Sequence, residues 1–174
     1  MIFITGNEEK LREFEEILGR KLGNAKLDLE EIQSIDVEEV AEFKAKRAYE
    51  ILKEPVIVED TGLYLDRYNG LPGAFIKLVL QKLSNQEFCD AIDGNRKGVV
   101  KTCIVFFDGK DSKIFIGETR GEIASSPRGD KGWGWDNFFI PEGGDKTFAE
   151  MEPEEKNEVS MRRKAIEKMK SSLL

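Results

Sequence analysis

Two adjacent carboxylates, Glu59 and Asp60, follow the apolar run 55–58 and precede Thr61 and Gly62. The β-branched run is typical of a buried strand, and we expect that strand to end at the two acids, with a break at Thr61-Gly62. Carboxylates at a strand end suit a hard cation, which takes oxygen ligands and substrate phosphates. Because consecutive strand side chains point to opposite faces, both acids can share one metal only if the strand ends between them. Otherwise one acid is catalytic or metal-binding and the other supports the structure. A solvated acidic turn is the alternative.

The N-terminal segment predicts an anion site. The apolar run 1–4 leads into the turn Thr5-Gly6-Asn7, after which apolar residues recur at helical spacing. A strand that enters a helix through a glycine turn presents free backbone N–H groups, and an anion binds there readily. Lys10, in the first helical turn, could reach a phosphate. The alternative is an ordinary helix start with Asn7 as the N-cap and Lys10 exposed.

Both tryptophans of the chain, Trp133 and Trp135, lie beside glycines in the run 132–136. This run is part of the Gly- and Pro-rich segment 125–145, which is long for a plain connection and predicts a functional loop that contains some strand. Flat rings beside flexible glycines suit a platform on which a base stacks. Asp136 could accept a hydrogen bond from a ring N–H. A loop that fills its own core with aromatic rings is an equal alternative.

The charged C-terminal segment from residue 153 reads as helical and carries Lys156 and Arg162. In one unbroken helix these two side chains would lie about 120° apart, so they could not easily contact the same ligand edge. A break at Ser160, acting as an N-cap, would turn both inward. A solvated helix of mixed charge is the alternative.

Composition narrows the classes of function. The chain has 174 residues and a formal net charge of −7, which fits one domain, residues 1–174, and argues against a broad nucleic-acid surface. Histidine is absent, so His-dependent nucleophilic catalysis and His-ligated zinc are excluded. Two isolated cysteines, no signal-peptide pattern and no apolar stretch of membrane-spanning length lead us to expect a cytoplasmic protein without a membrane partner.

The remaining elements predict an α/β fold with a mixed sheet, because helical and strand patterns alternate before an apparent hairpin. Helices are expected over 38–53 and, as one or two, within 74–92. Strands are expected over 99–107 and 113–123, joined by a tight turn around residues 108 and 109.

Taken together and in this order, six segments resemble the inosine triphosphate pyrophosphatase family. They are TGNEEK at 5–10, VEDTGL at 58–63, NGLPGAFIK at 69–77, GWGWDNFF at 132–139, TFAEM at 147–151 and EKNEVSMRRKA at 155–165. The resemblance implies an elongated fold of two lobes around a long mixed sheet, with the active site in the cleft between them. It also implies a homodimer that uses Mg²⁺ to hydrolyse ITP, dITP and XTP to the monophosphate and pyrophosphate.

The same resemblance implies a role for each matching residue. Asp60 is implied as the catalytic base or a metal ligand, with Glu59 beside it and Glu31 as a further metal carboxylate, although Glu30 is a neighbouring candidate. The substrate set implied for the phosphates and the base is Thr5, Gly6, Asn7, Lys10, Thr61, Trp133, Gly134, Trp135, Asp136, Lys156, Ser160, Met161 and Arg162.

One residue departs from the family pattern. Met161 stands where the family typically has histidine, and a thioether cannot hydrogen-bond as imidazole does, which bears on base selectivity more than on hydrolysis. Two other functions compete with the one implied: a pyrophosphatase for modified or pyrimidine triphosphates, and a nucleotide-binding sensor without activity. A nucleic-acid-binding module is disfavoured by the negative charge.

Overall fold

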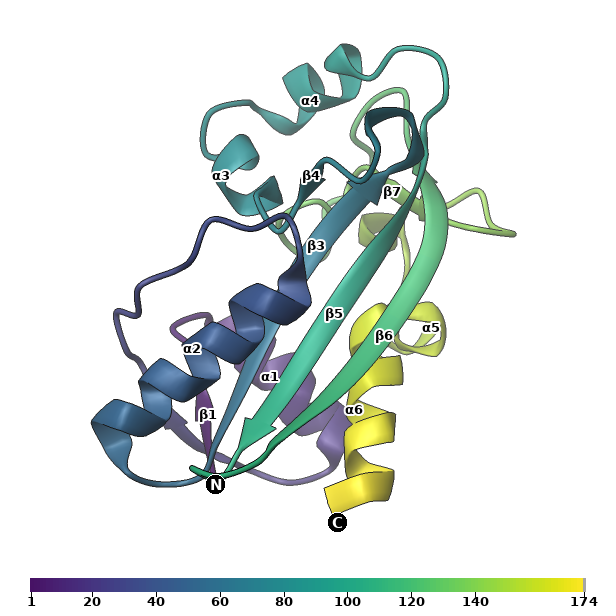
Figure 1. Cartoon of the computed structure of the whole chain (residues 1–174). Helices are drawn as coiled ribbons and strands as arrows, with labels where there is room; N and C mark the ends of the chain where they lie inside the picture. The colour runs from purple at the N-terminus through teal and green to yellow at the C-terminus, as the bar shows by residue number, and fades with distance from the viewer. Residues whose placement is uncertain (174) are drawn as a thin grey trace.

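The computed structural model describes residues 1–173, and its centre is one open mixed sheet (Figure 1). Its strands are β1 (Ile2–Ile4), β2 (Gly23–Ala25), β3 (Val56–Leu65), β4 (Pro72–Gly73), β5 (Lys97–Phe107), β6 (Ser112–Ile123) and β7 (Phe139–Pro141). The order is β2-β1-β3-β5-β6-β7, and β4 pairs with β3 off this path. The β2-β1-β3 pairs are parallel and the others are antiparallel. The predicted mixed α/β sheet is therefore confirmed.

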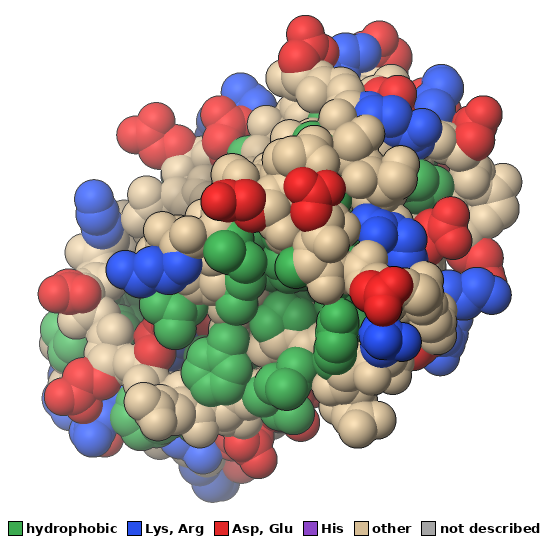
Figure 2. Space-filling model, turned by 90° about the horizontal axis from the view of Figure 1, so that it is seen from above, with side chains coloured by type: hydrophobic (Ala, Val, Ile, Leu, Met, Phe, Trp, Pro, Cys, Tyr) green, Lys and Arg blue, Asp and Glu red, His purple; other side chains and the backbone are tan. Residues whose placement is uncertain are grey.

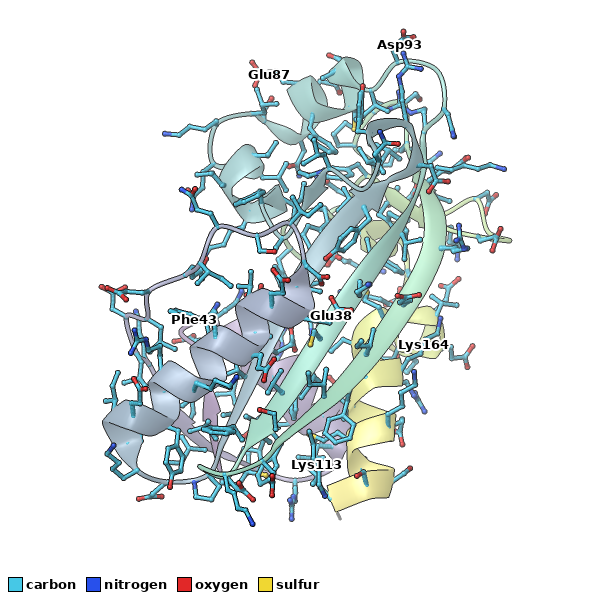
Figure 3. The ribbon with its side chains drawn as sticks, viewed as in Figure 1. Glu38, Phe43, Glu87, Asp93, Lys113 and Lys164 are labelled. Carbon is cyan, nitrogen blue, oxygen red and sulfur yellow. The ribbon has the colours of Figure 1, made fainter. Side chains whose placement is uncertain are left out.

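Helices cover both faces of this sheet. They are α1 (Glu8–Leu18), α2 (Val37–Leu52), α3 (Ile76–Leu80), α4 (Asn85–Ala91), α5 (Pro153–Val159) and α6 (Met161–Leu173), with short 3₁₀ turns η1 (Asp66–Tyr68) and η2 (Phe148–Glu150). One apolar core joins α1 and α6 to the sheet, and a second joins α2 to its opposite face. Glu38 of α2 also reaches the strands, where Lys101 of β5 lies 3.0 Å away (Figure 3).

A third apolar core forms a separate upper lobe. It gathers residues of β3, α3, α4, η2 and the segment 125–145, called the aromatic loop below, among them Leu63, Phe88, Phe138 and Phe148. Figure 1 shows the long strands β3, β5 and β6 running from the lower lobe into this one. The two-lobed, elongated arrangement thus follows from three cores strung along one sheet.

The upper lobe also carries exposed apolar side chains. Leu71 and Leu78 are 51% and 54% exposed, and Figure 2, which looks down on this end, shows apolar side chains gathered near the middle of the face. None of the helices in residues 1–173 is both long and apolar enough to cross a membrane. Cys89 and Cys103 are both free and buried.

The prediction that the acidic pair ends a strand is wrong. β3 runs from Val56 to Leu65 without a break and pairs with β5 along its whole length. Gly62 lies in the middle of β3. A Cβ atom at this position would sit only 2.8 Å from the ring of Tyr64 and 2.9 Å from Val37, so glycine is the residue that fits. The glycine therefore marks a close approach within a strand, which is a second common meaning of glycine in such a pattern.

The other predicted elements agree closely with the structure. The helix over 38–53 is α2, the segment 74–92 forms two helices, and the hairpin strands are β5 and β6. The long loop contains the short strand β7, as expected. The strand β2 was not predicted, since Gly23-Asn24-Ala25 has no strand-like side chains and is held by its pairing with β1.

Candidate functional site

The buried guanidinium of Arg162 lies at the centre of the site. α5 ends at Val159 and α6 begins at Met161, and the hydroxyl of Ser160 accepts a hydrogen bond from the backbone N–H of Arg162 at 3.1 Å. The predicted break at Ser160 is thus confirmed. The Nε and Nη2 atoms of Arg162 donate to the two carboxylate oxygens of Glu59 at 2.9 and 3.0 Å, the bidentate geometry that guanidinium favours.

Glu13 of α1 links the two cations of the C-terminal helices. Its carboxylate accepts from Arg162 Nη1 and, at 2.9 Å, from Lys156 Nζ. Lys156 also donates to Asp136 Oδ2 at 2.9 Å. The break between α5 and α6 therefore turns both Lys156 and Arg162 inward, as the sequence predicted, and both contact the carboxylate of Glu13.

Charge pairing sets the protonation of these buried groups. Burial alone would raise the pKa of Glu59, but the adjacent Arg162 and Lys10 hold it at about 2. Burial likewise opposes ionisation of Glu13, yet Arg162 and Lys156 keep its pKa below the ordinary value. The pKa of Asp136 is raised, because burial outweighs the attraction of Lys156. Glu59 and Glu13 are consequently held in their ionised forms by the cations beside them.

The turn Thr5-Gly6-Asn7, which the sequence predicts as an anion site, lies directly beside the acidic pair. Parallel pairing of Ile4 with Val58 places the turn next to Glu59 and Asp60. The side chain of Asn7 caps α1 by accepting from the backbone N–H groups of residues 9 and 10, at 3.0 and 3.1 Å. Thr5 Oγ1 accepts from the N–H of Asn7 at 3.1 Å. Asn7 is thus the N-cap, and Lys10 is not a free surface lysine, since its Nζ lies 3.4 Å from Glu59.

The two carboxylates of the acidic pair face opposite sides of the sheet. Glu59 is buried with Arg162, and Thr61, on the same face, donates to it at 3.2 Å. Asp60 faces α2, where Lys44 Nζ lies 3.1 Å from Asp60 Oδ2 and 2.8 Å from Glu31 Oε1. Glu59 and Asp60 therefore do not converge on one point, and Asp60 shares a cation with Glu31 instead.

The donors present fit a divalent cation at Asp60 better than at Glu59. Within residues 1–173 there is no cluster of three or more potential protein ligands. Asp60 and Glu31 nevertheless meet at one ammonium group, so two carboxylates already surround a single positive charge. Mg²⁺ is commonly held by one or two carboxylates together with substrate phosphates. Glu30 instead lines a separate hollow with Arg47, so the structure favours Glu31 over its neighbour.

The two tryptophans have different environments. Trp135 is 9% exposed and packs in the upper-lobe core, as does Met161 at 3%. Both side chains therefore contribute to the upper-lobe core. Trp133 is half-buried, with its ring over Arg162 at 5.2 Å from the guanidinium carbon. The carbonyl of Gly134 accepts from Asn85 of α4 at 2.9 Å, which anchors the loop.

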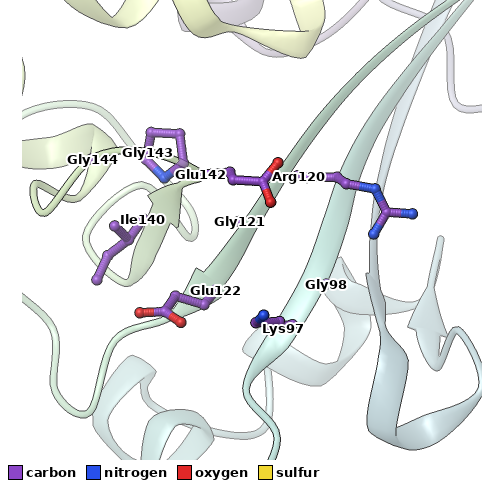
Figure 4. Close-up of a pocket in the computed structure, with 10 residues that line it drawn as sticks. Lys97, Gly98, Arg120, Gly121, Glu122, Ile140, Glu142, Gly143 and Gly144 are labelled. Carbon is purple, nitrogen blue, oxygen red and sulfur yellow. The ribbon is translucent and has the colours of Figure 1, made fainter.

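A hollow of about 230 Å³ lies away from all of these groups. It occurs where β5, β6 and β7 meet, and Figure 4 shows Arg120, Glu122 and Glu142 among its lining residues. No residue of the predicted site lines it. The site is therefore identified by its chemistry and not by this hollow.

Sequence comparison places this arrangement among known proteins. A sequence model of the Ham1 family matches residues 1–172. The chain belongs to the Ham1 family. The chain is 40% identical over 174 residues to a dITP/XTP pyrophosphatase of Methanopyrus kandleri, covering 97% of this chain and 93% of that protein. It is 42% identical over 177 residues to an inosine triphosphate pyrophosphatase of Yarrowia lipolytica, covering 98% and 93%.

Structural comparison agrees with this membership. The fold is similar to that of a HAM1 protein from Coxiella burnetii, with a TM-score of 0.82 and 27% sequence identity over 99% of this chain and 97% of that one. The resemblance inferred from the six sequence segments is confirmed.

Two residues of this Ham1 site, Glu13 and Lys44, are absent from the predicted set. Glu13 lies three residues after Lys10 on α1, so its helical position was a usable signal. Its partners, however, lie 143 and 149 positions away in the sequence. Lys44 lies in the middle of α2 and contacts Asp60 only because that helix packs across β3.

We predict that Glu59→Gln destabilises the protein by about 3 kcal/mol at neutral pH, because a buried cation loses its counter-charge. The folded-state pKa of Glu59, about 2, lies below the ordinary 4.5. Its stabilising contribution is therefore full above pH 4.5 and is lost as the pH falls toward 2. Urea unfolding at several pH values should show wild type and variant converging over that range. Glu16→Gln, at an exposed position of α1, is the control, and a pH-independent gap would contradict the assignment.

Proposed function

We propose that this protein hydrolyses non-standard purine nucleoside triphosphates, namely ITP, dITP and XTP, to the monophosphate and pyrophosphate. The observation that carries the proposal is that the carboxylates of Asp60 and Glu31 both contact the ammonium group of Lys44, beside the turn 5–7. A charged triphosphate with its divalent cation fits that arrangement. The names of the relatives, which match nearly end to end, indicate the substrate class.

In this proposal the triphosphate lies along the turn at the start of α1. Backbone N–H groups at a helix N-terminus favour an anion, and Lys10 adds a positive charge in the first helical turn. Asn7 already occupies two of these N–H groups as the cap, so the remaining groups of the turn and Lys10 hold the phosphates. Thr61, on the Glu59 side of β3, supplies a hydroxyl nearby.

Asp60 is proposed to orient and deprotonate the attacking water. Its Oδ1 accepts from the backbone N–H of Thr61 at 2.9 Å, and its Oδ2 accepts from Lys44. Both contacts fix the carboxylate without protonating it. The water oxygen bonds to the α-phosphorus, its proton passes to Asp60, and the bond to the bridging oxygen breaks as pyrophosphate leaves. Asp60 and Glu31 would hold a Mg²⁺ ion, which would neutralise charge on the phosphates.

The purine end of the substrate is proposed to lie beside the aromatic loop. Asp136, Lys156 and Arg162 form a continuous set of ion pairs with Glu13 at this end. Trp133 is the half-buried ring above that set. A base stacked on this ring would present its polar edge to the charged groups.

We also propose that the protein is a cytoplasmic homodimer. The exposed side chains of Leu71 and Leu78, and Ile35 whose carbonyl bonds to residue 74 beside them, offer an apolar surface on the upper lobe. Two buried free cysteines suit a reducing compartment.

The direct test is incubation with ITP, XTP, dITP, GTP and ATP, with and without Mg²⁺. We expect Mg²⁺-dependent release of pyrophosphate from the first three and little from ATP. Orthophosphate release would show that a different bond is cleaved. Saturable binding of ITP without turnover would favour the nucleotide sensor instead.

For Asp60→Asn we expect an intact fold and a turnover reduced by at least about a hundredfold, because the amide accepts no proton. Initial rates of pyrophosphate release with ITP measure the loss, and circular dichroism checks the fold. Asp66→Asn, on η1 beyond the end of the same strand, is the control with a similar change of charge. Turnover near the wild-type value would contradict the role of Asp60.

Glu31→Gln and Glu30→Gln distinguish the two candidate metal carboxylates. We expect Glu31→Gln to raise the Mg²⁺ concentration needed for half-maximal activity about tenfold or more, since it removes a charged ligand shared with Asp60. Glu30→Gln, whose side chain lines the hollow with Arg47, should leave that concentration unchanged. Titration of activity with Mg²⁺ at saturating ITP measures both. The reverse ranking would transfer the role to Glu30.

A further inference from the structure

Arg96 connects two segments of the upper lobe through four hydrogen bonds. It directly precedes β5, and its backbone carbonyl accepts from the N–H of Ile123 at 2.9 Å, so the end of β6 holds its backbone in place. Its guanidinium donates to the carbonyls of Cys89 and Ile92, at the C-terminal end of α4. It also donates to the carbonyls of Ile123 and Ala124, where β6 runs into the aromatic loop. All four acceptors are backbone oxygens.

The chemistry of arginine suits this link. The last carbonyls of a helix have no partner inside the helix, and a cationic side chain can satisfy them. Guanidinium carries five N–H groups in a rigid plane and can therefore span two segments at once. Lysine presents three donors from a single nitrogen and cannot reproduce that geometry. Because Arg96 is also half-buried, it joins α4 to the start of the aromatic loop as a fixed link.

The N-terminal end of α4 is tied to the same loop. Asn85 Nδ2 donates to the carbonyl of Gly134 at 2.9 Å and to Oδ1 of Asn137 at 2.8 Å. Between the two ends of the helix, the ring of Phe88 packs against that of Phe138, with 5.1 Å between the ring centroids. The helix is thus joined to the aromatic loop along its whole length.

These contacts hold the part of the loop that carries Trp133. The N–H of Ala124 donates to the carbonyl of Phe138 at 2.8 Å, which brings the two arms of the loop together beside Arg96. Trp133 lies in the chain between these two residues, with its ring over the guanidinium of Arg162. The position of that ring therefore depends on contacts that α4 and Arg96 make with both arms.

We propose that Arg96 is a positioning residue, which acts with α4 to hold the aromatic loop in its nucleotide-binding position before the nucleotide arrives. This inference rests on the proposed function, in which the purine end of the substrate lies beside that loop. A loop that is ordered in advance need not be ordered on binding, and this raises affinity. If the loop occupied that position in only about a tenth of the molecules, the apparent dissociation constant would rise about tenfold.

The effect should fall on substrate binding and not on the chemical step. The carboxylates of Asp60 and Glu31 are held through Lys44 of α2, and this ion-pair set is separate from the contacts of Arg96. Once ITP is bound, the loop is in place in wild type and variant alike. A rise in KM at nearly constant kcat is therefore the mark of this role.

The test is Arg96→Lys, which keeps the charge and removes the planar set of donors. We expect KM for ITP to rise about tenfold and kcat to stay within about twofold of the wild-type value. Calorimetry should show that the variant binds IMP about tenfold more weakly. Arg67→Lys is the matched control, because it changes an exposed contact with Asp93 in the same lobe, and it should leave both KM and IMP affinity unchanged.

A second measurement needs no ligand. Both tryptophans of the chain lie in the aromatic loop, so tryptophan fluorescence reports on this segment alone. We expect acrylamide to quench it more strongly in Arg96→Lys than in wild type, because a released loop exposes its rings. Asn85→Ala removes the contacts at the other end of α4 and leaves the cap formed by Ser84 and Glu87. It should raise both KM and quenching in the same way.

Unchanged KM and quenching in both variants would overturn the inference. A fall in kcat at constant KM would also overturn it, since Arg96 would then support the fold and not the loop. If circular dichroism shows that Arg96→Lys does not fold, Asn85→Ala decides by the same two measurements. Absence of ITP turnover in wild type would instead overturn the proposed function, and unchanged quenching in both variants would still overturn the role of Arg96.

Discussion

The site depends on one buried cation. Arg162 is 2% exposed, and its guanidinium joins the start of α6 to Glu59 in the central strand and Glu13 on α1. Moving such a charge out of water is costly, and the cost is offset only when the surrounding carboxylates are complete and well oriented. Lysine could not replace it, because the paired N–H groups of guanidinium match both oxygens of Glu59. The relative placement of α1, β3 and α6 is therefore coupled to this one set of charges.

This coupling limits how the site can recognise a base. The positive groups nearest the aromatic loop are neutralised by Glu13, Glu59 and Asp136 before any substrate arrives. The positive charges of Lys156 and Arg162 therefore contribute less to selection among purine bases than their number alone would suggest. In the proposed function, the electrostatic attraction of the triphosphate comes instead from the opposite end, around Lys10 and the helix N-terminus.

Local patterns were enough to predict where two helices start but not the contacts between elements. Asn7 and Ser160 act as caps through neighbours two or three residues away, so short-range chemistry revealed them. β3 was predicted to break at Thr61-Gly62 because both residue types are common in turns. Its continuity depends on pairing with β5 about forty residues away in the sequence. Glu13 and Lys44 were missed for the same reason, since distant elements make them part of the site.

The alternation of a strand explains why two adjacent acids have unlike roles. Glu59 and Asp60 have similar chemistry, but the unbroken strand directs one into the α1–α6 face and the other toward α2. Full burial and bidentate pairing suit Glu59 to hold Arg162, and they leave it no free oxygen with which to take a proton. Asp60 is only partly buried and shares its cation with a half-exposed Glu31. It can therefore exchange partners at far lower cost. The dipeptide links the ion pairs around Arg162 to the side of the sheet on which the proposed hydrolysis takes place. We therefore expect substitutions at its two positions to act first on different properties: folding at Glu59 and turnover at Asp60.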